Sequence, residues 1–411
     1  MLCDLFLFKL YVQNYIKNMH PRLFIFLVMI CSNMIVNAQT HIASFFSDGM
    51  ILQQQKSINI WGIDSAGTKI HVVSSWGETS QATTSTNGKW KLQLTTPTAG
   101  GPHAISIKGS SIVTINDVLI GEVWVCSGQS NMQIPLRGGL DGNFIEGGLD
   151  AIVNSKNDRI RFFTVKQNTS LKPLDNVKGI WEKAAPSTSG SFSAVGYFFA
   201  QQLEKVLDVP IGIVVTAWGS STAEAWSDDK TLHDLGITIP NEIAEMPQKT
   251  PTVLYNAMMH PLIGYGIKGV LWYQGEANRR NANEYEKIVN TMVTSWREQW
   301  NIGDFPFYYA QIAPFNYGKN SLVPHTTSTV KSKSSPKIST AKHSITSSKP
   351  YIAVGKIYSV TNDIATECTG TLIGKAVVVT SAECVAEGGG SVADQVWFPP
   401  AATNSSGEGF G

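Results

Sequence analysis

The chain has 411 residues, and 43% of them are hydrophobic, so it is long enough to form several domains with sizeable cores. Its 32 basic and 31 acidic residues leave a formal net charge of +1. Because this balance gives no strong field of either sign, it argues against nucleic acid or an anionic lipid surface as the partner and fits a neutral or small polar substrate.

Residues 1–38 have the pattern of a secretory leader. A basic start is followed by the apolar run Leu23–Ile30 and then by small residues, which predicts a signal peptide cleaved after Ala38. A membrane anchor is the alternative, but polar residues interrupt the apolar stretch, and it is short for a bilayer span. We therefore expect an exported protein, periplasmic or extracellular, without membrane attachment once the leader is removed.

Residues 39–116 contain short runs in which apolar and polar residues alternate. The runs INIWGI, KIHVVSS, KWKLQLTT and HAISIKG are separated by glycine, asparagine and proline. Alternation with period two is typical of strands with one buried face, and the close spacing of the runs favours antiparallel pairing. This segment is therefore predicted to be a β-sandwich.

Residues 117–320 show a different pattern. Apolar, β-branched runs (VLIGEVWV, IGIVVTAW, KGVLWYQG, FPFYYAQIA) alternate with amphipathic segments (VGYFFAQQLEKVL, NEYEKIVNTMVTSWREQW). Such βα alternation predicts a parallel sheet covered on both faces by helices, so the fold class is α/β with a three-layer α/β/α domain. In such domains ligands bind at the carboxyl ends of the strands.

The C-terminal part changes in composition twice. Residues 321–350 are dominated by serine, threonine, lysine and proline, cannot bury much apolar surface, and are predicted to be a linker. Residues 351–411 contain the strand-like runs YIAVGKIYS and CTGTLIGKAVVV and are predicted to form a short β-rich fragment.

Three motifs follow the apolar runs of the α/β segment at their carboxyl ends. They are GQSNM with Ser130, AWGSSTAEAW with Gly219, and WYQGEAN with Gln274 and Glu276. Singly, each has an ordinary explanation: a helix N-cap, a plain turn or a hydrogen-bonded strand end. Together they provide what acyl transfer requires, a serine hydroxyl at a tight turn and hydrogen-bond donors for an oxyanion.

At these motifs the chain resembles the sialate O-acetylesterases of the SGNH hydrolase class. The similarity covers about residues 41–316 and includes GEVWVCSGQSNMQIPL and YNAMMHPLIGYGIKGVLWYQGEAN. The resemblance implies that Ser130 is the nucleophile, that Gly219 and Gln274 are oxyanion-hole positions, and that Ser127 is a structural serine of the turn. It further implies hydrolysis of an acetyl ester on sialic acid or a related sugar through an acyl-enzyme, with no metal or other cofactor.

The resemblance also calls for a histidine base on an Asp-x-x-His loop, which this sequence lacks. None of the eight histidines has an aspartate three residues before it, so the hydrolase segment is predicted to be C-terminally truncated and its activity impaired. His260 matches a family position where a buried, hydrogen-bonded structural role is expected. Glu276 is a possible substitute, but an ordinary carboxylate is a poor base for a serine hydroxyl.

The tail, residues 351–411, resembles the beginning of a trypsin-like or glutamyl-endopeptidase-like serine protease. Glu383 stands where that resemblance would place the catalytic histidine, and no protease-type nucleophile motif follows. Cys368 and Cys384 are predicted to form a structural disulfide that closes a β-hairpin, since an exported protein meets an oxidising environment. A zinc site is the weaker alternative, because two cysteines without paired histidines provide too few ligands.

The sequence therefore predicts an exported carbohydrate esterase that acts on an O-acetylated sugar or sialoglycan. One alternative is a catalytically inactive carbohydrate-binding protein, because both hydrolase resemblances lack their histidine. Another is a fused or misassembled chain whose tail belongs to a second protein. The sequence does not determine which sugar is bound or the oligomeric state.

Overall fold

The computed structural model describes residues 39–139 and 144–312, together with the backbone of several strands beyond residue 312. The predicted leader, most of the predicted linker and much of the tail lie outside these residues. Among the described residues, no helix is both long and apolar enough to cross a membrane.

The N-terminal strands alternate buried and exposed residues as the sequence predicts. In β6 (Lys89–Thr95), Trp90, Leu92 and Leu94 are buried, while the residues between them, Lys91 and Gln93, are exposed. β3 (Ser57–Ile63) pairs antiparallel with β6 on one side and with β1 (His41–Ile42) on the other, which forms a three-stranded sheet.

A second, ten-stranded sheet extends from the N-terminal part into the rest of the chain. Its N-terminal strands are β2 (Ile51–Gln53), β4 (Lys69–Ser74), β5 (Thr79–Thr83), β7 (Gly100–Lys108) and the first half of β8 (Ile112–Gly128). β8 pairs antiparallel with β7 along its first half and parallel with two other strands along its second half. The predicted domain boundary between residues 116 and 117 therefore lies within one continuous strand.

The second half of β8 is the centre of a parallel sheet. Its neighbours are β11 (Ile211–Ala217) and β12 (Gly269–Tyr273), which pair in turn with β9 (Asn157–Thr164) and β13 (Phe307–Tyr309). β10 (Trp181–Ala184) adds an antiparallel edge next to β9. All seven residues of β11 are buried, as expected for a strand covered on both faces. The predicted parallel sheet and the α/β class are confirmed.

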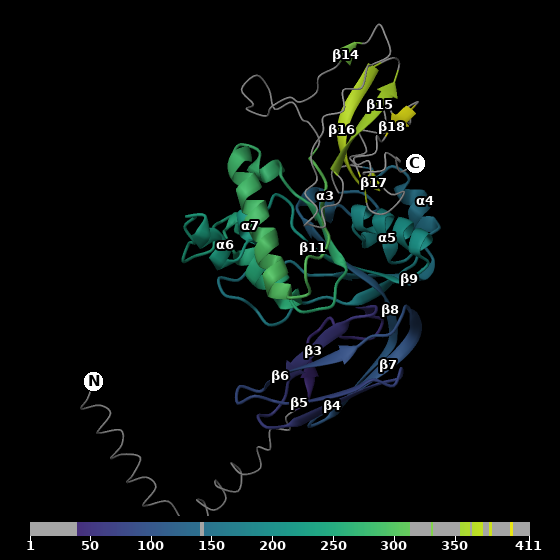
Figure 1. Ribbon diagram of the computed structural model, residues 1–411, viewed down its shortest axis with the longest axis vertical. Coiled ribbons are helices and arrows are strands. Elements are labelled where there is room, and N and C mark those ends of the chain that lie inside the picture. Colours follow the sequence, from purple (N-terminus) through teal and green to yellow (C-terminus); the bar gives the residue numbers. More distant parts are fainter. Residues whose placement is uncertain are drawn as a thin grey trace, which may run out of the picture.

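Two long helices pack on this sheet and bury different cores. α5 (Ala194–Leu207) contributes Tyr197 and Phe199 to one core, whereas α7 (Ala282–Trp300) contributes Met292 and Trp296 to another. α5 and α7 lie on opposite sides of the parallel strands in Figure 1. The short helices are α3 (Ser130–Gln133), α4 (Gly148–Val153) and α6 (Asp229–Asp234).

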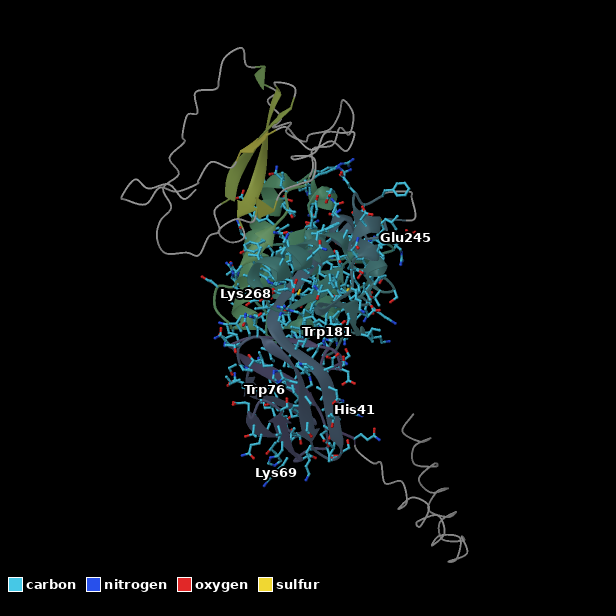
Figure 2. All side chains as sticks on the ribbon, turned by 90° about the vertical axis from the view of Figure 1, so that its right-hand side faces the viewer. His41, Lys69, Trp76, Trp181, Glu245 and Lys268 are labelled. Atoms are coloured by element: carbon cyan, nitrogen blue, oxygen red, sulfur yellow. The ribbon has the colours of Figure 1, made fainter. Side chains whose placement is uncertain are left out.

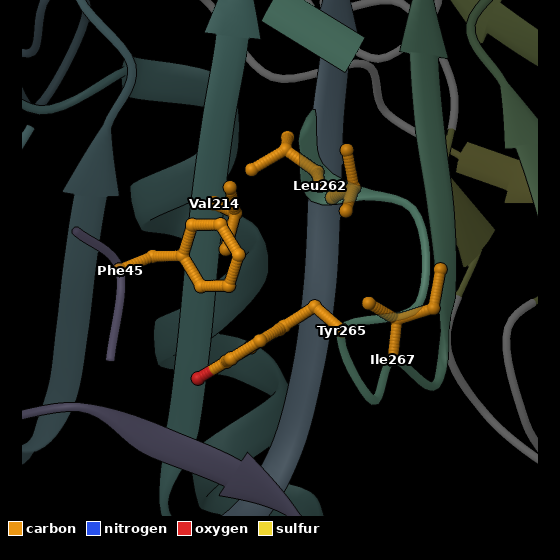
Figure 3. A pocket seen from close by; sticks show the side chains of 6 residues that line it. Phe45, Val214, Leu262, Tyr265 and Ile267 are labelled. Carbon is orange, nitrogen blue, oxygen red and sulfur yellow. The ribbon is translucent and has the colours of Figure 1, made fainter. Parts of the chain in front are cut away.

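The junction between the N-terminal strands and the parallel sheet is tightly packed. Trp181 lies at this junction (Figure 2) and donates its indole N–H to the Phe45 carbonyl at 2.8 Å. Phe45, Val214 and Tyr265 line an apolar gap there (Figure 3) that has no room for a water-sized sphere. The Tyr265 hydroxyl donates to the Ile51 carbonyl at 2.6 Å. The gap is therefore part of the packed core and is not a ligand site.

Beyond residue 312, the structure describes strands only. β15 (Val354–Thr361) pairs antiparallel with β16 (Ile364–Leu372), and the shorter strands are β14 (Val330–Lys331), β17 (Val378–Val379) and β18 (Gln395–Trp397). Glu383 and Cys384 lie outside the described residues, so the disulfide and the protease-like assignment stay predictions.

Candidate active site

The GQSNM motif lies where β8 ends and α3 begins. Gly128, the last residue of β8, has a φ of +139°, and a Cβ there would lie 2.1 Å from the Tyr273 carbonyl oxygen on β12. The Gln129 amide donates to the same carbonyl at 2.9 Å. Only glycine permits this close approach of the two strands, and the turn that follows places Ser130 at the carboxyl end of the sheet.

Ser130 is half-buried, and its hydroxyl forms no hydrogen bond with any described residue. As the first residue of α3, it also has a backbone N–H without an intrahelical acceptor, and the same holds for Asn131. A serine hydroxyl and two amide donors without an intrahelical acceptor are thus present at one strand end.

Ser127 does not lie in the turn, which corrects the role expected from the sequence. It belongs to β8, where it pairs in register with Thr216 of β11 and Trp272 of β12. Its side chain is fully buried, and its hydroxyl has no hydrogen-bond partner among the described residues. The turn lies at Gln129, between the end of β8 at Gly128 and the start of α3 at Ser130.

Gly219 comes close to Ser130, as predicted for an oxyanion-hole pair. It follows β11, and a Cβ built on it would lie 3.7 Å from the Cβ of Ser130. The Gly219 N–H donates to Oε1 of Gln133 at 2.6 Å, so this amide is occupied by a side chain of the protein itself. Sequence reasoning missed Gln133, although its position three residues after Ser130 on a helical turn places both on one face.

Gln274 follows β12 and is buried, but its amide is engaged elsewhere. Its Nε2 donates to the Ser221 carbonyl at 3.0 Å and to Oδ1 of Asn278 at 2.8 Å. The Ser221 carbonyl can only accept, so it fixes which end of the carboxamide is nitrogen. Both N–H bonds are therefore used, and none is left for an oxyanion in this rotamer. The oxyanion-hole assignment of Gln274 stays a prediction.

Asn278 connects the second and third motifs. Its Oδ1 also accepts from the Ala223 amide at 3.0 Å, and its Nδ2 donates to the Glu224 carboxylate, at 2.9 Å to Oε2. Glu224 was not singled out from the sequence, because an acidic residue in a polar loop gives no local signal of its partner. This network fixes the loop after β11 against the loop after β12.

Glu276 lies next to the serine motif. Its Oε1 accepts from the side-chain amide of Asn131 at 2.6 Å, while its Oε2 is buried without a partner among the described residues. Burial raises the pKa of Glu276 above its ordinary value, and a backbone hydrogen bond opposes this only in part. The carboxyl is therefore a stronger proton acceptor, once ionised, than an exposed glutamate.

No histidine in the described part of the chain hydrogen-bonds to Ser130. These histidines are His41, His71, His103, His233 and His260. The ring of His260 is half-buried, and its Nδ1 lies 2.9 Å from the Leu174 carbonyl, so it has a hydrogen-bonded structural contact of the kind predicted. In the same part of the chain, no cluster of acidic, histidine and cysteine side chains could hold a metal ion.

The arrangement can support acyl transfer chemically. Ser130 supplies a hydroxyl. Its own amide can donate to an oxyanion, as can that of Gly219 once the Gln133 side chain moves away, and Glu276 is a half-buried carboxyl that accepts a hydrogen bond from Asn131, the residue after Ser130. Of the predicted residues, the structure brings Ser130, Gly219 and Glu276 into one site, with the Gln274 side chain directed toward the supporting network.

Comparison with known proteins gives consistent matches. The family described as carbohydrate esterase, sialic acid-specific acetylesterase, matches residues 120–351, more than half of the chain. Human sialate O-acetylesterase is 29% identical over 302 residues, which cover 66% of this chain and 57% of that protein. The rat protein of the same name is 28% identical over 359 residues, covering 72% and 65%.

A solved structure is also similar. The crystal structure of a carbohydrate acetylesterase from Xanthomonas citri has a TM-score of 0.60 and 33% sequence identity, and the match covers 66% of this chain and 60% of that one. The chain thus spans less than two thirds of the length of these relatives.

Proposed function

The chain belongs to the sialic acid-specific acetylesterase family of carbohydrate esterases, and from this premise we propose that it hydrolyses acetyl esters carried by sialic acid or a related sugar. The observation that carries the proposal is the close approach of Ser130 and Gly219 at adjacent strand ends. A serine hydroxyl beside a backbone donor is the minimum arrangement for forming an acyl-enzyme.

The position of Gln133 supports the proposed oxyanion site. Its Oε1 is an amide oxygen 2.6 Å from the Gly219 nitrogen, close to the roughly 2.7–3.1 Å expected between a donor and an oxyanion. We infer that this oxygen stands in for the substrate's carbonyl oxygen. A bound ester would displace the exposed Gln133 side chain and accept hydrogen bonds from the Gly219 and Ser130 amides.

The reaction then proceeds in two steps. Ser130 Oγ attacks the acetyl carbonyl and loses its proton, the tetrahedral intermediate collapses, and the sugar oxygen leaves with a proton. Water attacks the acetyl-Ser130 ester, releasing acetate and regenerating the hydroxyl. We propose that Glu276, held by Asn131, accepts the serine proton through a water molecule. No described histidine is available for this role, and loss of triad members typically lowers the rate about 10⁴-fold, so activity should be weak.

The test is the release of acetate from an O-acetylated sialic acid. Ser130→Ala should abolish the activity, because it removes the hydroxyl that the proposed mechanism uses as the nucleophile. Ser127→Ala is the matched control, since no described residue hydrogen-bonds to its buried hydroxyl, and its removal should leave both activity and melting temperature nearly unchanged. Equal loss in both variants, or retention in Ser130→Ala, would contradict the proposal.

A catalytically inactive carbohydrate-binding protein is the second candidate, favoured by the absence of a histidine at Ser130 among the described residues. One hybrid chain distinguishes the esterase from the binding protein. In it, everything after Asn316 is replaced with a segment that carries the family's Asp-x-x-His loop, final strand and helix. If the chain is an impaired or misassembled esterase, the rate should rise by orders of magnitude. A folded hybrid that releases no acetate would support the binding protein.

We also propose a finer description of the architecture. The two N-terminal sheets would form a β-sandwich, because Ile60 of one sheet and Ile120 of the other belong to a single core. The parallel strands would form the middle of three layers, because separate cores lie beneath α5 and α7.

For the two ends of the chain, we propose export after cleavage at Ala38 and a protease-like tail without peptidase activity. Sequencing the N-terminus of secreted protein should yield Gln39 as the first residue. The full chain should leave peptide substrates uncleaved, because a carboxylate at Glu383 cannot relay a proton as imidazole does near neutral pH.

A further inference from the structure

A groove with a volume of about 520 Å³ lies between the β1–β3–β6 sheet and the segments around residues 174–176 and 260–263. It is remote from the candidate active site, because β3 and β6 lie at one end of the parallel strands and α3 at the other (Figure 1). We propose that this groove binds a sugar that carries a carboxylate. The proposal goes beyond the esterase reaction, since it requires nothing of Ser130.

The groove contains an aromatic surface that is held in place. Trp61 lines it and is half-buried, and its ring packs edge-on against Phe45 and Phe46, with centroid distances of 5.1 and 4.9 Å. A ring fixed on one side and partly open on the other is suited to stacking against the apolar face of a pyranose, because little side-chain entropy is lost on binding.

The charges lining the groove favour an anion. Lys89 forms an ion pair with Asp175 across the groove, with 2.8 Å between Nζ and Oδ1. Lys91 also lines the groove and is exposed, and among the described residues it has no acidic partner. It therefore leaves one positive charge beside Trp61, where a ligand carboxylate would gain a charge-assisted hydrogen bond.

His260 adds a hydrogen-bonding group to the groove, and the tautomer of its neutral ring is set by its contact with Leu174. Its Nδ1 lies 2.9 Å from the Leu174 carbonyl, which can only accept, so Nδ1 carries the proton and donates. In the neutral ring, Nε2 is then an acceptor, available to a sugar hydroxyl. Trp61, Lys91 and His260 thus offer a stacking surface, a cation and a hydrogen-bond acceptor.

The size and the charge of the groove favour a small sugar over a nucleic acid. A volume near 520 Å³ is typical of small-molecule sites and fits a mono- or disaccharide. A single unpaired lysine provides too little charge for a nucleic acid, which is bound by several phosphate contacts. The groove therefore fits a small acidic sugar best.

The experiment uses the full chain labelled with ¹⁵N at tryptophan and the methyl glycoside of N-acetylneuraminic acid as the probe. The indole N–H resonance of Trp61 is identified by its absence in Trp61→Phe. It should shift on titration with the acidic sugar, and the methyl glycoside of N-acetylglucosamine should give no comparable shift. An equal response to the neutral sugar, or no response to either, would overturn the proposal.

Two variants test whether the charge of Lys91 contributes to binding. Lys91→Gln should weaken binding about tenfold, and Lys69→Gln, an exposed lysine on β4 outside the groove, should bind like the unmodified chain. Thermal melting verifies that both variants fold. Equal affinities for these two variants would refute the role of the cation.

Ser130→Ala tests whether binding in the groove is independent of the candidate esterase site. The Trp61 titration should be unchanged in that variant, whether or not the chain releases acetate. Loss of the Trp61 shift in Ser130→Ala would mean that the probe reports the esterase site, which would overturn a separate groove site.

Discussion

Gly128→Ala should destabilise the fold and disable the candidate site together. The added Cβ would lie 2.1 Å from the Tyr273 carbonyl oxygen, and ordinary contact begins at 3.4 Å, so β8 and β12 must separate by about 1.3 Å. Because that oxygen belongs to the backbone of a paired strand, it cannot rotate away. Overpacking of this kind costs about 1–3 kcal/mol, and a non-glycine residue at a φ of +139° costs about 1–3 kcal/mol more.

The expected loss is therefore about 2–6 kcal/mol, which corresponds to a fall in melting temperature of roughly 5–20 °C for a unit of this size. Displacement of Ser130, two residues further on, should also abolish acetate release. Circular dichroism melting and the acetate assay measure the two effects.

Gly67→Ala is the matched control. Gly67 has a φ of +78°, but nothing lies within 4 Å of its added Cβ, so this variant carries only the backbone cost of about 1 kcal/mol. If the two variants melt within a degree of each other, the steric argument for Gly128 is wrong.

Two further predictions concern pH. Burial raises the pKa of Glu276, so acetate release should increase with pH through a midpoint above 4.5. Glu276→Gln should lack this rise. An unchanged pH profile in that variant would exclude Glu276 as the base. Burial opposes ionisation of Asp64, but hydrogen bonds from Ser110, Thr40 and Ser65 outweigh it and lower the pKa from 3.8 to about 2. Asp64 therefore stabilises the fold above pH 3.8, and about 2 kcal/mol should be lost as the pH falls through 2. Urea unfolding should show this acid-dependent loss in the unmodified chain and not in Asp64→Asn, and equal losses would refute it.

The sequence by itself determined the local structure and predicted which residues gather at the strand ends. Buried Trp90, Leu92 and Leu94 alternate with exposed residues in β6 because the side chains of a strand alternate between its two faces. The mostly apolar run of β11 identified a strand buried on both faces. Ser130 and Gly219 could be paired in advance because the carboxyl ends of adjacent parallel strands meet at one edge of a sheet.

Only the tertiary structure decided which partner each polar group takes. The Gly219 amide binds Gln133, the Gln274 amide turns to Ser221, and β8 continues through the predicted domain boundary. The groove likewise combines Trp61 with His260, residues about two hundred positions apart. Periodicity and turn chemistry are local properties of the chain, whereas a hydrogen bond between distant segments depends on distances of a few tenths of an ångström that only the packed fold sets.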